Sequence, residues 1–271
     1  MGKGSGHLLL RVVSSLVLLP IVLVLLWQGG WWFFCLILAL TTIAVFEYVS
    51  MLRRLDYRPS YPFALCLLWA VLLAFHLSGA FSYLQPALAG VLVISLAWHV
   101  LRDRTTTPIQ NWLLPLAGAL YIGWCAGHMF SLRTLPGGAY RLFTVFGITW
   151  LTDTGSYLVG RTWGKHPMAP RVSPGKTWEG FAGGVASAVI GGAVISGLGG
   201  LGWGHGALMG LLLSLVGPLG DLGISMIKRE AGVKDSSKLI PGHGGVLDRL
   251  DSILLTVVVG YYYQVWVMGA G

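Results

Sequence analysis

The stretch GWWFFCLILALTTIAVFEYVS, residues 30–50, contains a single charged side chain, that of Glu47. A helix of about 20 mostly apolar residues is long enough to cross the hydrocarbon core of a bilayer. Runs of this kind recur along the 271-residue chain, which is 55% hydrophobic and only 10% charged, with a mean hydropathy of +0.73. A soluble domain carries about 25% charged residues. The sequence therefore predicts an all-α integral membrane protein with little chain outside the bilayer.

Hydropathy and the Gly and Pro positions predict about nine transmembrane helices. The expected spans are 8–28, 30–50, 61–79, 81–101, 110–131, 139–160, 178–198, 205–227 and 248–269. We expect the first span to be retained, because its apolar run is longer than that of a signal peptide and no A-x-A site follows it. Five spans would form an N-terminal part, residues 1–135. Four would form a C-terminal catalytic part, residues 136–271, with cytoplasmic loops at 161–177 and 228–247. The stretches GFAGG and LGGLGWGHG are expected to serve close helix packing and a tight outer turn.

The basic residues predict the orientation of these spans. With a cytoplasmic N-terminus, 16 of the 18 Lys and Arg residues fall on the cytoplasmic side, and only Arg133 and Arg141 fall outside. Lys and Arg accumulate on the cytoplasmic side of membrane proteins. We therefore expect a multi-pass protein of the cell (inner) membrane with its C-terminus outside. The net charge of +8 then reflects orientation and contact with phosphates, and it does not indicate nucleic acid.

All ten acidic residues lie on or near the predicted cytoplasmic side, several of them inside predicted helices, where an unpaired charge costs about 2.5–3.5 kcal/mol. Asp248 and Asp251 are three residues apart at a helix start and so share one face. Asp221 lies at comparable depth on the preceding helix. These carboxylates could form structural salt bridges with nearby bases, or they could converge on a hard cation such as Mg²⁺, for which oxygen ligands are suited. Convergence of all three carboxylates favours the cation.

Phosphate-binding groups are expected beside these acids. The bases near them in sequence are Lys228, Arg229, Lys234, Lys238 and Arg249, with His243 inside PGHGG. Glycines around His243 would let backbone N–H groups approach an anion, and the helix starting near Asp248 would add its positive dipole end.

A second candidate phosphate contact lies in SPGKTWEG, residues 173–180. This stretch is not a P-loop, because Pro170 stands where the motif needs glycine and no strand is predicted before it. We expect a Ser-Pro turn at Ser173, followed by Lys176 and a helix start near Thr177. Acids and bases together at a membrane surface predict phosphoryl or nucleotidyl transfer onto a lipid.

The stretch SMIKREAGVKDSSKLIPGHGGVLDRLDS, residues 225–252, resembles the signature of the phosphatidate cytidylyltransferases, also called CDP-diacylglycerol synthases. The resemblance extends to GPLGDLG (217–223), SPGKTWEG (173–180) and TDTGSYLVGRTWGKH (152–166). It covers the C-terminal half, whereas the first ~130 residues match only as apolar helices. Gly175 and Ile224 depart from the pattern, and an acid is common in the family at the second of these positions.

The resemblance implies transfer of a cytidylyl group from CTP to phosphatidic acid, giving CDP-diacylglycerol and pyrophosphate in phospholipid biosynthesis. It also implies Mg²⁺, with a second cation left open, and a homodimer whose membrane-embedded cleft opens to the cytoplasm and to lipid. The expected metal ligands are Asp221, Asp248 and Asp251. Other expected catalytic residues are Lys228 and Arg249. The expected substrate-binding residues are Asp153, Ser173, Lys176, Arg229, Lys234 and His243.

Four other functions are alternatives to this one. A CDP-archaeol synthase or a polyprenol kinase would use the same acids and bases on another lipid or transferred group. A CDP-alcohol phosphotransferase is disfavoured, because its D-G-x-x-A-R region is not found in the sequence. A cation transporter is disfavoured because its embedded acids would lie near mid-membrane, whereas these acids lie at the cytoplasmic end.

Overall fold

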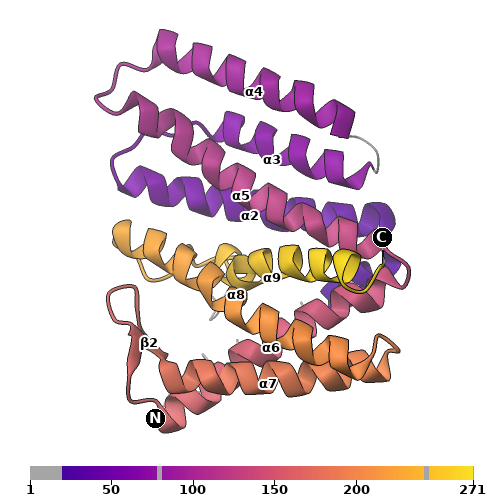
Figure 1. Ribbon diagram of the computed structural model, residues 1–271. Coiled ribbons are helices and arrows are strands. Elements are labelled where there is room, and N and C mark those ends of the chain that lie inside the picture. Colours follow the sequence, from indigo (N-terminus) through magenta and orange to yellow (C-terminus); the bar gives the residue numbers. More distant parts are fainter. Residues whose placement is uncertain (1–19, 78–80, 241–243, 271) are drawn as a thin grey trace. The chain divides into compact units, whose positions relative to one another are not determined.

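The computed structural model describes residues 20–77, 81–240 and 244–270 (Figure 1). Residues 20–28 are helical, so the predicted first span is described from residue 20 only, and its earlier part lies outside the described residues. The helices that follow are α2 (Gly30–Arg54), α3 (Tyr61–His76), α4 (Phe81–Arg102), α5 (Pro108–Thr134), α6 (Gly138–Trp163), α7 (Trp178–Leu198), α8 (Trp203–Glu230) and α9 (Leu247–Trp266).

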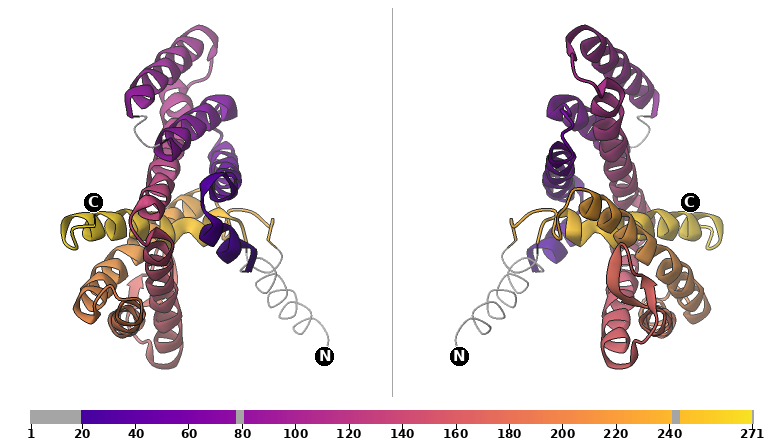
Figure 2. Two further views of the ribbon diagram at one scale, coloured as in Figure 1. Left: turned by 90° about the vertical axis from the view of Figure 1, so that its right-hand side faces the viewer. Right: turned by 90° about the vertical axis from the view of Figure 1, so that its left-hand side faces the viewer.

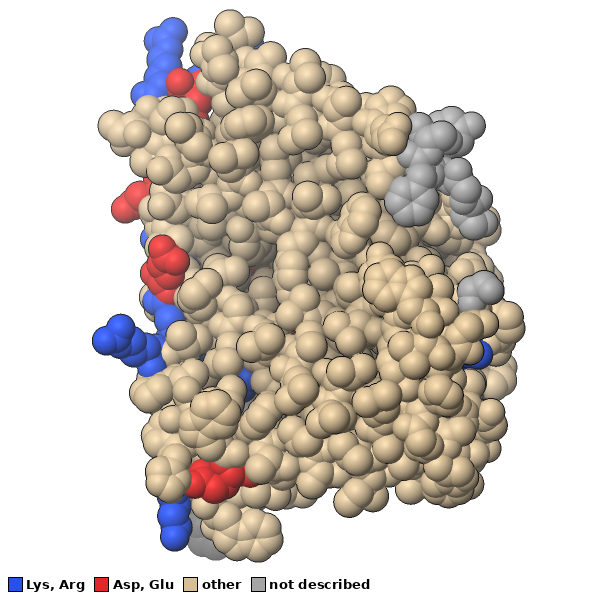
Figure 3. All heavy atoms as spheres, in the orientation of Figure 1, with Lys and Arg blue, Asp and Glu red and all other residues tan. Residues whose placement is uncertain are grey.

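Five of these helices are long and apolar enough to cross a membrane, namely α2, α4 over Leu84–Arg102, α5, α7 and α8. Helix α3 is apolar but has only 16 residues, and α6 and α9 do not combine the length and apolar composition of these five helices. Most of the surface visible in Figure 3 is neither acidic nor basic, as expected for helices that face lipid. The chain is therefore an α-helical protein with several helices suited to membrane crossing.

A short hairpin interrupts the helical pattern in the loop predicted over 161–177 (Figure 2). Strands β1 (Pro167–Ala169) and β2 (Ser173–Thr177) pair antiparallel, with Ala169 opposite Ser173. Ser173 therefore lies in a strand, and the expected Ser-Pro turn is wrong, because the chain reverses before it at residues 170–172. The helix start near Thr177 is confirmed, since the Thr177 side chain accepts a hydrogen bond from the Gly180 amide at 3.1 Å, as an N-cap does.

The chain divides into two compact units. Unit 1 comprises Met1–Phe130 and Glu230–Arg249, and unit 2 comprises Ser131–Arg229 and Leu250–Gly271. The segment 230–249 thus groups with the N-terminal helices, whereas the sequence-based division at residue 135 assigns it to the C-terminal part.

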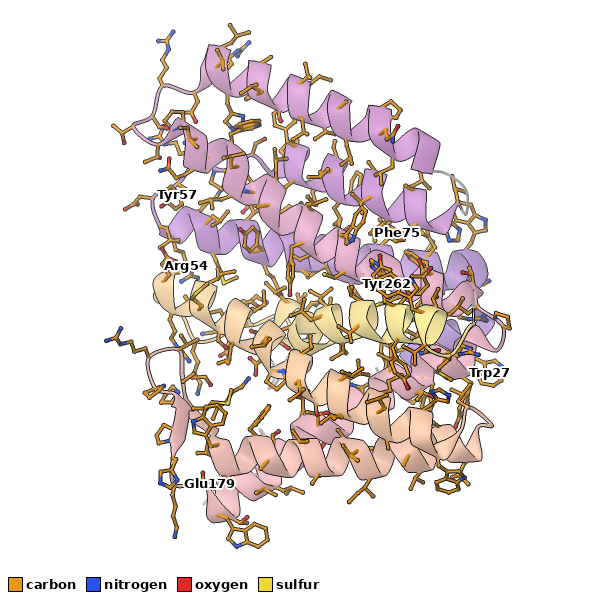
Figure 4. The ribbon with its side chains drawn as sticks, in the orientation of Figure 1. Trp27, Arg54, Tyr57, Phe75, Glu179 and Tyr262 are labelled. Carbon is orange, nitrogen blue, oxygen red and sulfur yellow. The ribbon has the colours of Figure 1, made fainter. Side chains whose placement is uncertain are left out.

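Helix α5 of unit 1 contacts α2, α3 and α4. A Cβ at Gly118 would overlap the Tyr48 ring of α2, and a Cβ at Gly127 would overlap the Phe75 ring of α3, which Figure 4 labels. Trp112 of α5 donates its indole N–H to the Ser95 hydroxyl of α4 at 2.9 Å. Small residues allow helices to approach closely where lipid removes the hydrophobic drive for association.

Unit 2 is packed through glycines. The predicted packing role of GFAGG is confirmed, because a Cβ at Gly184 of α7 would overlap the Ser156 hydroxyl of α6. The predicted turn in LGGLGWGHG is confirmed as well, since Gly200 and Gly202 have φ of 74° and 91°, values that favour glycine. Between α8 and α9, a Cβ at Gly220 would overlap the carbonyl oxygen of Asp251. This last contact sets the spacing of two helices that carry acidic side chains.

Candidate functional site

The hairpin presents Lys176 to α8, where it pairs with Asp221. Lys176 Nζ lies 2.7 Å from Asp221 Oδ2, with both side chains partly buried at 26% and 32% exposure. One turn further along α8, the Ser225 hydroxyl donates to Asp221 Oδ1 at 3.1 Å. Lys176 Nζ also lies 3.4 Å from the Pro218 carbonyl oxygen. Both oxygens of Asp221 are therefore engaged, and a lysine at the end of a strand balances its charge.

Asp251 of α9 lies close enough to Asp221 to interact with it electrostatically. Its side chain is buried at 8% exposure, and the charges of Asp221, Lys228 and Asp153 act on it. Lys228 is itself buried at 7% exposure, whereas Asp153 lies on an exposed part of α6. Unit 2 thus gathers five predicted site residues, which we call the acid–lysine cluster: Asp153, Lys176, Asp221, Lys228 and Asp251.

Ser173 belongs to the hairpin, and Arg229 lies beside it. The Arg229 Nε–H donates to the Val172 carbonyl oxygen at 3.1 Å, which ties the end of α8 to the residue before β2. Ser173 is the next residue and is half-buried. Figure 4 labels Glu179, which follows this hairpin in the first turn of α7. These contacts hold the hairpin, and with it Lys176, against α8.

Asp248 belongs to unit 1 and has a hydrogen-bond network of its own. Its Oδ2 atom accepts from the Ser236 amide, the Ser236 hydroxyl and the Gly245 amide, each at 2.9 Å. Helix α9 begins at Leu247, so Asp248 and Asp251 lie one turn apart in its first two turns, as the sequence predicted. Lys234 and Arg249 are exposed, and His243 lies outside the described residues.

The start of α9 is also bound by Glu47 of α2. Glu47 Oε1 accepts from the Ser237 hydroxyl at 2.6 Å and the Val246 amide at 3.0 Å. Its Oε2 accepts from the Ser236 hydroxyl at 2.9 Å and the Leu247 amide at 2.8 Å. The amides of Gly245, Val246 and Leu247 at this helix start therefore bind protein carboxylates.

Sequence reasoning missed the roles of Glu47 and of the three serines Ser225, Ser236 and Ser237. A signal existed for Glu47, because a carboxylate within an apolar run is costly unless it is paired. The sequence placed Glu47 at the inner end of its span but gave no indication of its partners, which lie 189 to 200 residues further along the chain.

The residues present suit Mg²⁺ in donor chemistry. No group of three or more His, Cys, Asp or Glu side chains able to hold one ion occurs among the described residues. Mg²⁺, however, usually binds through one or two carboxylates together with waters and substrate phosphates. Asp221 and Asp251 would supply two carboxylates, and Lys176 already places a positive charge 2.7 Å from Asp221. The acid–lysine cluster thus fits a cation that a phosphate-bearing substrate helps to hold.

A helical protein with membrane-crossing helices and a partly buried cluster of acids and lysines has the features of an enzyme that handles phosphates at a membrane. The profile of the Cytidylyltransferase family matches residues 9–267. The chain belongs to this family, and it is a nucleotidyltransferase enzyme.

Similar proteins include two named phosphatidate cytidylyltransferases. The chain is 37% identical over 235 residues to the phosphatidate cytidylyltransferase of Bacillus subtilis (strain 168), covering 84% of this chain and 86% of the relative. It is 43% identical over 152 residues to the phosphatidate cytidylyltransferase of Brucella suis biovar 1 (strain 1330), covering 55% and 56%. It is also 34% identical over 236 residues to the uncharacterized protein YnbB of Escherichia coli (strain K12), covering 82% and 78%. The resemblance inferred from residues 225–252 is confirmed.

Proposed function

We propose that this chain is a phosphatidate cytidylyltransferase of phospholipid biosynthesis, which converts CTP and phosphatidic acid into CDP-diacylglycerol and pyrophosphate. The observation that carries the proposal is that the family match over residues 9–267 includes every residue of the acid–lysine cluster. The relative of Bacillus subtilis, named for this activity, aligns with 84% of the chain.

The proposed reaction needs charge neutralisation more than it needs a base. An ionised phosphate oxygen of phosphatidate attacks the α-phosphorus of CTP and forms the new P–O bond. The bond from the α-phosphorus to the bridging oxygen of the β-phosphate breaks, and pyrophosphate leaves with that electron pair. Lys176 and Lys228 would stabilise the negative charge that develops along this path. The remaining task of the protein is to hold both phosphates in line.

Mg²⁺ is the proposed cofactor, with Asp221, Asp248 and Asp251 as its ligands and a second cation as a further part of the proposal. When bound, the cation would neutralise the triphosphate and the leaving pyrophosphate. Two observations support this assignment. Asp248 and Asp251 share one face of α9, and Asp221 lies within electrostatic range of Asp251.

The substrate phosphates are proposed to contact basic and polar residues around the acids. In addition to Lys176 and Lys228, these are Ser173, Arg229, Lys234, His243 and Arg249, while Asp153 is proposed to line the substrate cleft. Support for the hairpin residues comes from the Arg229 hydrogen bond to Val172, which holds the hairpin beside the end of α8.

We also propose nine spans in the cell (inner) membrane, an N-terminus in the cytoplasm, a C-terminus outside, and an active site that faces the cytoplasm. Helices α2, α4, α6 and α8 each carry Arg or Lys in their last turn, which supports a cytoplasmic position for these ends. A homodimer belongs to the same proposal and rests on the family resemblance.

The test uses purified protein in detergent with phosphatidic acid, Mg²⁺ and CTP labelled at the α-phosphate, followed by lipid extraction. We expect label in the lipid phase that requires both phosphatidic acid and Mg²⁺. CTP labelled at the γ-phosphate is the control and must leave the lipid unlabelled. Label from the γ-phosphate would indicate a lipid kinase, and label that appears only with an isoprenoid phosphate would indicate a different acceptor. Either result would overturn the proposed substrates.

A further inference from the structure

Glu47 is a buried carboxylate that the proposed reaction does not yet use. It lies in the apolar run of α2, seven residues before the end of that helix, and is 6% exposed. Figure 4 labels Arg54 and Tyr57 at and just beyond this end of α2. Its partners lie in the segment 230–249, which belongs to the same compact unit. A carboxylate kept in such a position requires compensating hydrogen bonds.

Each oxygen of Glu47 accepts a hydrogen bond from a backbone amide and lies within hydrogen-bond distance of a serine hydroxyl, and Oε2 shares the single Ser236 hydroxyl proton with Asp248 Oδ2. Oε1 binds Ser237 and Val246, and Oε2 binds Ser236 and Leu247, at 2.6 to 3.0 Å. The two amides are among the first N–H groups of α9, which have no partner within the helix. Glu47 therefore acts as a cap for α9 supplied by another helix, and its negative charge is favourable at that end of the helix dipole.

The same contacts surround Asp248. The Ser236 hydroxyl lies 2.9 Å from both Glu47 Oε2 and Asp248 Oδ2. Gly245 donates its amide to Asp248, and a Cβ at Gly245 would overlap the Ser236 hydroxyl and crowd both Glu47 oxygens. Glu47 thus holds Val246 and Leu247, which precede Asp248 in the chain. It also holds Ser236, the serine that binds the Asp248 carboxylate.

We infer that Glu47 is a positioning residue, which fixes the start of α9 and the serine loop so that the Asp248 carboxylate keeps its catalytic orientation. The inference rests on the proposed function, in which Asp248 takes part in the transfer. Displacing a catalytic group by about 1 Å can lower the rate about 100-fold. Loss of this support should therefore lower kcat more than it weakens substrate binding.

Glu47→Gln is the test variant, because it keeps the size of the side chain but replaces one accepting oxygen with an NH₂ group. A serine hydroxyl can rotate away from that group, whereas a backbone amide cannot. We expect kcat to fall about 10- to 100-fold, with KM for CTP unchanged within about threefold and the elution volume and Tm of the protein close to wild type. Asp56→Asn is the matched control, because Asp56 is exposed at the same end of α2 with φ of 62°, a conformation that Asn tolerates. We expect its kcat to stay within about twofold of wild type.

Ser237→Ala provides a second, milder variant in case Glu47→Gln does not fold. It removes the 2.6 Å hydrogen bond to Glu47 and should lower kcat by a smaller factor, about threefold or more. In the Glu47→Gln background it should cause little further loss, because the two side chains act through one contact.

The results separate the two proposals. If wild-type protein forms no CDP-diacylglycerol, the proposed function fails, and the role of Glu47 in that reaction fails with it. If wild type is active and the folded Glu47→Gln variant keeps kcat within threefold, the inference about Glu47 alone is overturned. A lower Tm with unchanged kcat per folded molecule would likewise make Glu47 purely structural and overturn it. Should Glu47→Gln fail to fold, normal kcat in Ser237→Ala would have the same meaning.

Discussion

Replacing Gly220 with alanine tests whether the spacing of α8 and α9 controls the acid–lysine cluster. Gly220 directly precedes Asp221 and faces the backbone of Asp251, whose carbonyl oxygen a Cβ would overlap. A carbonyl of a helix cannot turn aside as a flexible side chain can. The two backbones would have to separate by on the order of 1 Å to restore ordinary contact. Gly223, which lies on the same helix, is the matched control, because a Cβ there would meet nothing within 4 Å.

The expected magnitudes follow from two opposing effects. Overpacking of a close contact costs about 1–3 kcal/mol, and alanine in place of glycine within a helix gains up to about 1 kcal/mol. Gly223→Ala should therefore be neutral or slightly stabilised. Gly220→Ala should be less stable than Gly223→Ala by about 1–3 kcal/mol. Because Asp221 and Asp251 would move apart in Gly220→Ala, the kcat of this variant should fall by up to about 100-fold.

The assay combines thermal unfolding in detergent with the rate of label transfer from CTP to lipid. Both variants are measured at the same protein concentration and in the same detergent, so that the difference between them reports the α8–α9 contact. Equal Tm and equal kcat in Gly220→Ala and Gly223→Ala would refute the reasoning, since they would mean that the spacing of the two helices can change without consequence for either carboxylate.

Three further predictions concern the proposed metal ligands, the role of Lys176 and the orientation of the chain in the membrane. Asp248→Asn and Asp251→Asn should each abolish turnover while Tm stays close to wild type, and near-normal activity in either would remove that residue from the proposed metal ligands. Lys176→Met should lower kcat/KM at least about tenfold, because it removes the cation 2.7 Å from Asp221. The control Lys165→Met alters an exposed loop lysine, and an equal effect there would contradict a specific role for Lys176. For topology, a cysteine placed at Arg133 should react with a membrane-impermeant reagent on intact cells, whereas one placed at Lys165 should react only after permeabilisation. The reverse pattern would invert the proposed orientation.

The helices themselves were largely predictable. Span seven was predicted at 178–198 and α7 runs over Trp178–Leu198, while α8 and α9 begin within two residues of their predicted starts. Helix positions could be predicted because they depend on local properties of the sequence. An apolar run that crosses a membrane and the polar residue that ends it lie within about 20 residues of each other. The β1–β2 hairpin was missed, since strands of three and five residues carry almost no periodic signal.

The sequence alone determined the membrane class, the family and the acidic and basic residue types of the site. Hydropathy, charge and a continuous motif are all local properties, which do not depend on how the chain folds. Only the tertiary structure decided which of these charges meet. It pairs Lys176 of the hairpin with Asp221 of α8, and it brings Glu47 to an amide 200 residues further along the chain. It also sets Gly220 against the backbone of Asp251. Such partners are selected by how helices pack after the chain folds back on itself, and no local pattern of residues encodes that choice.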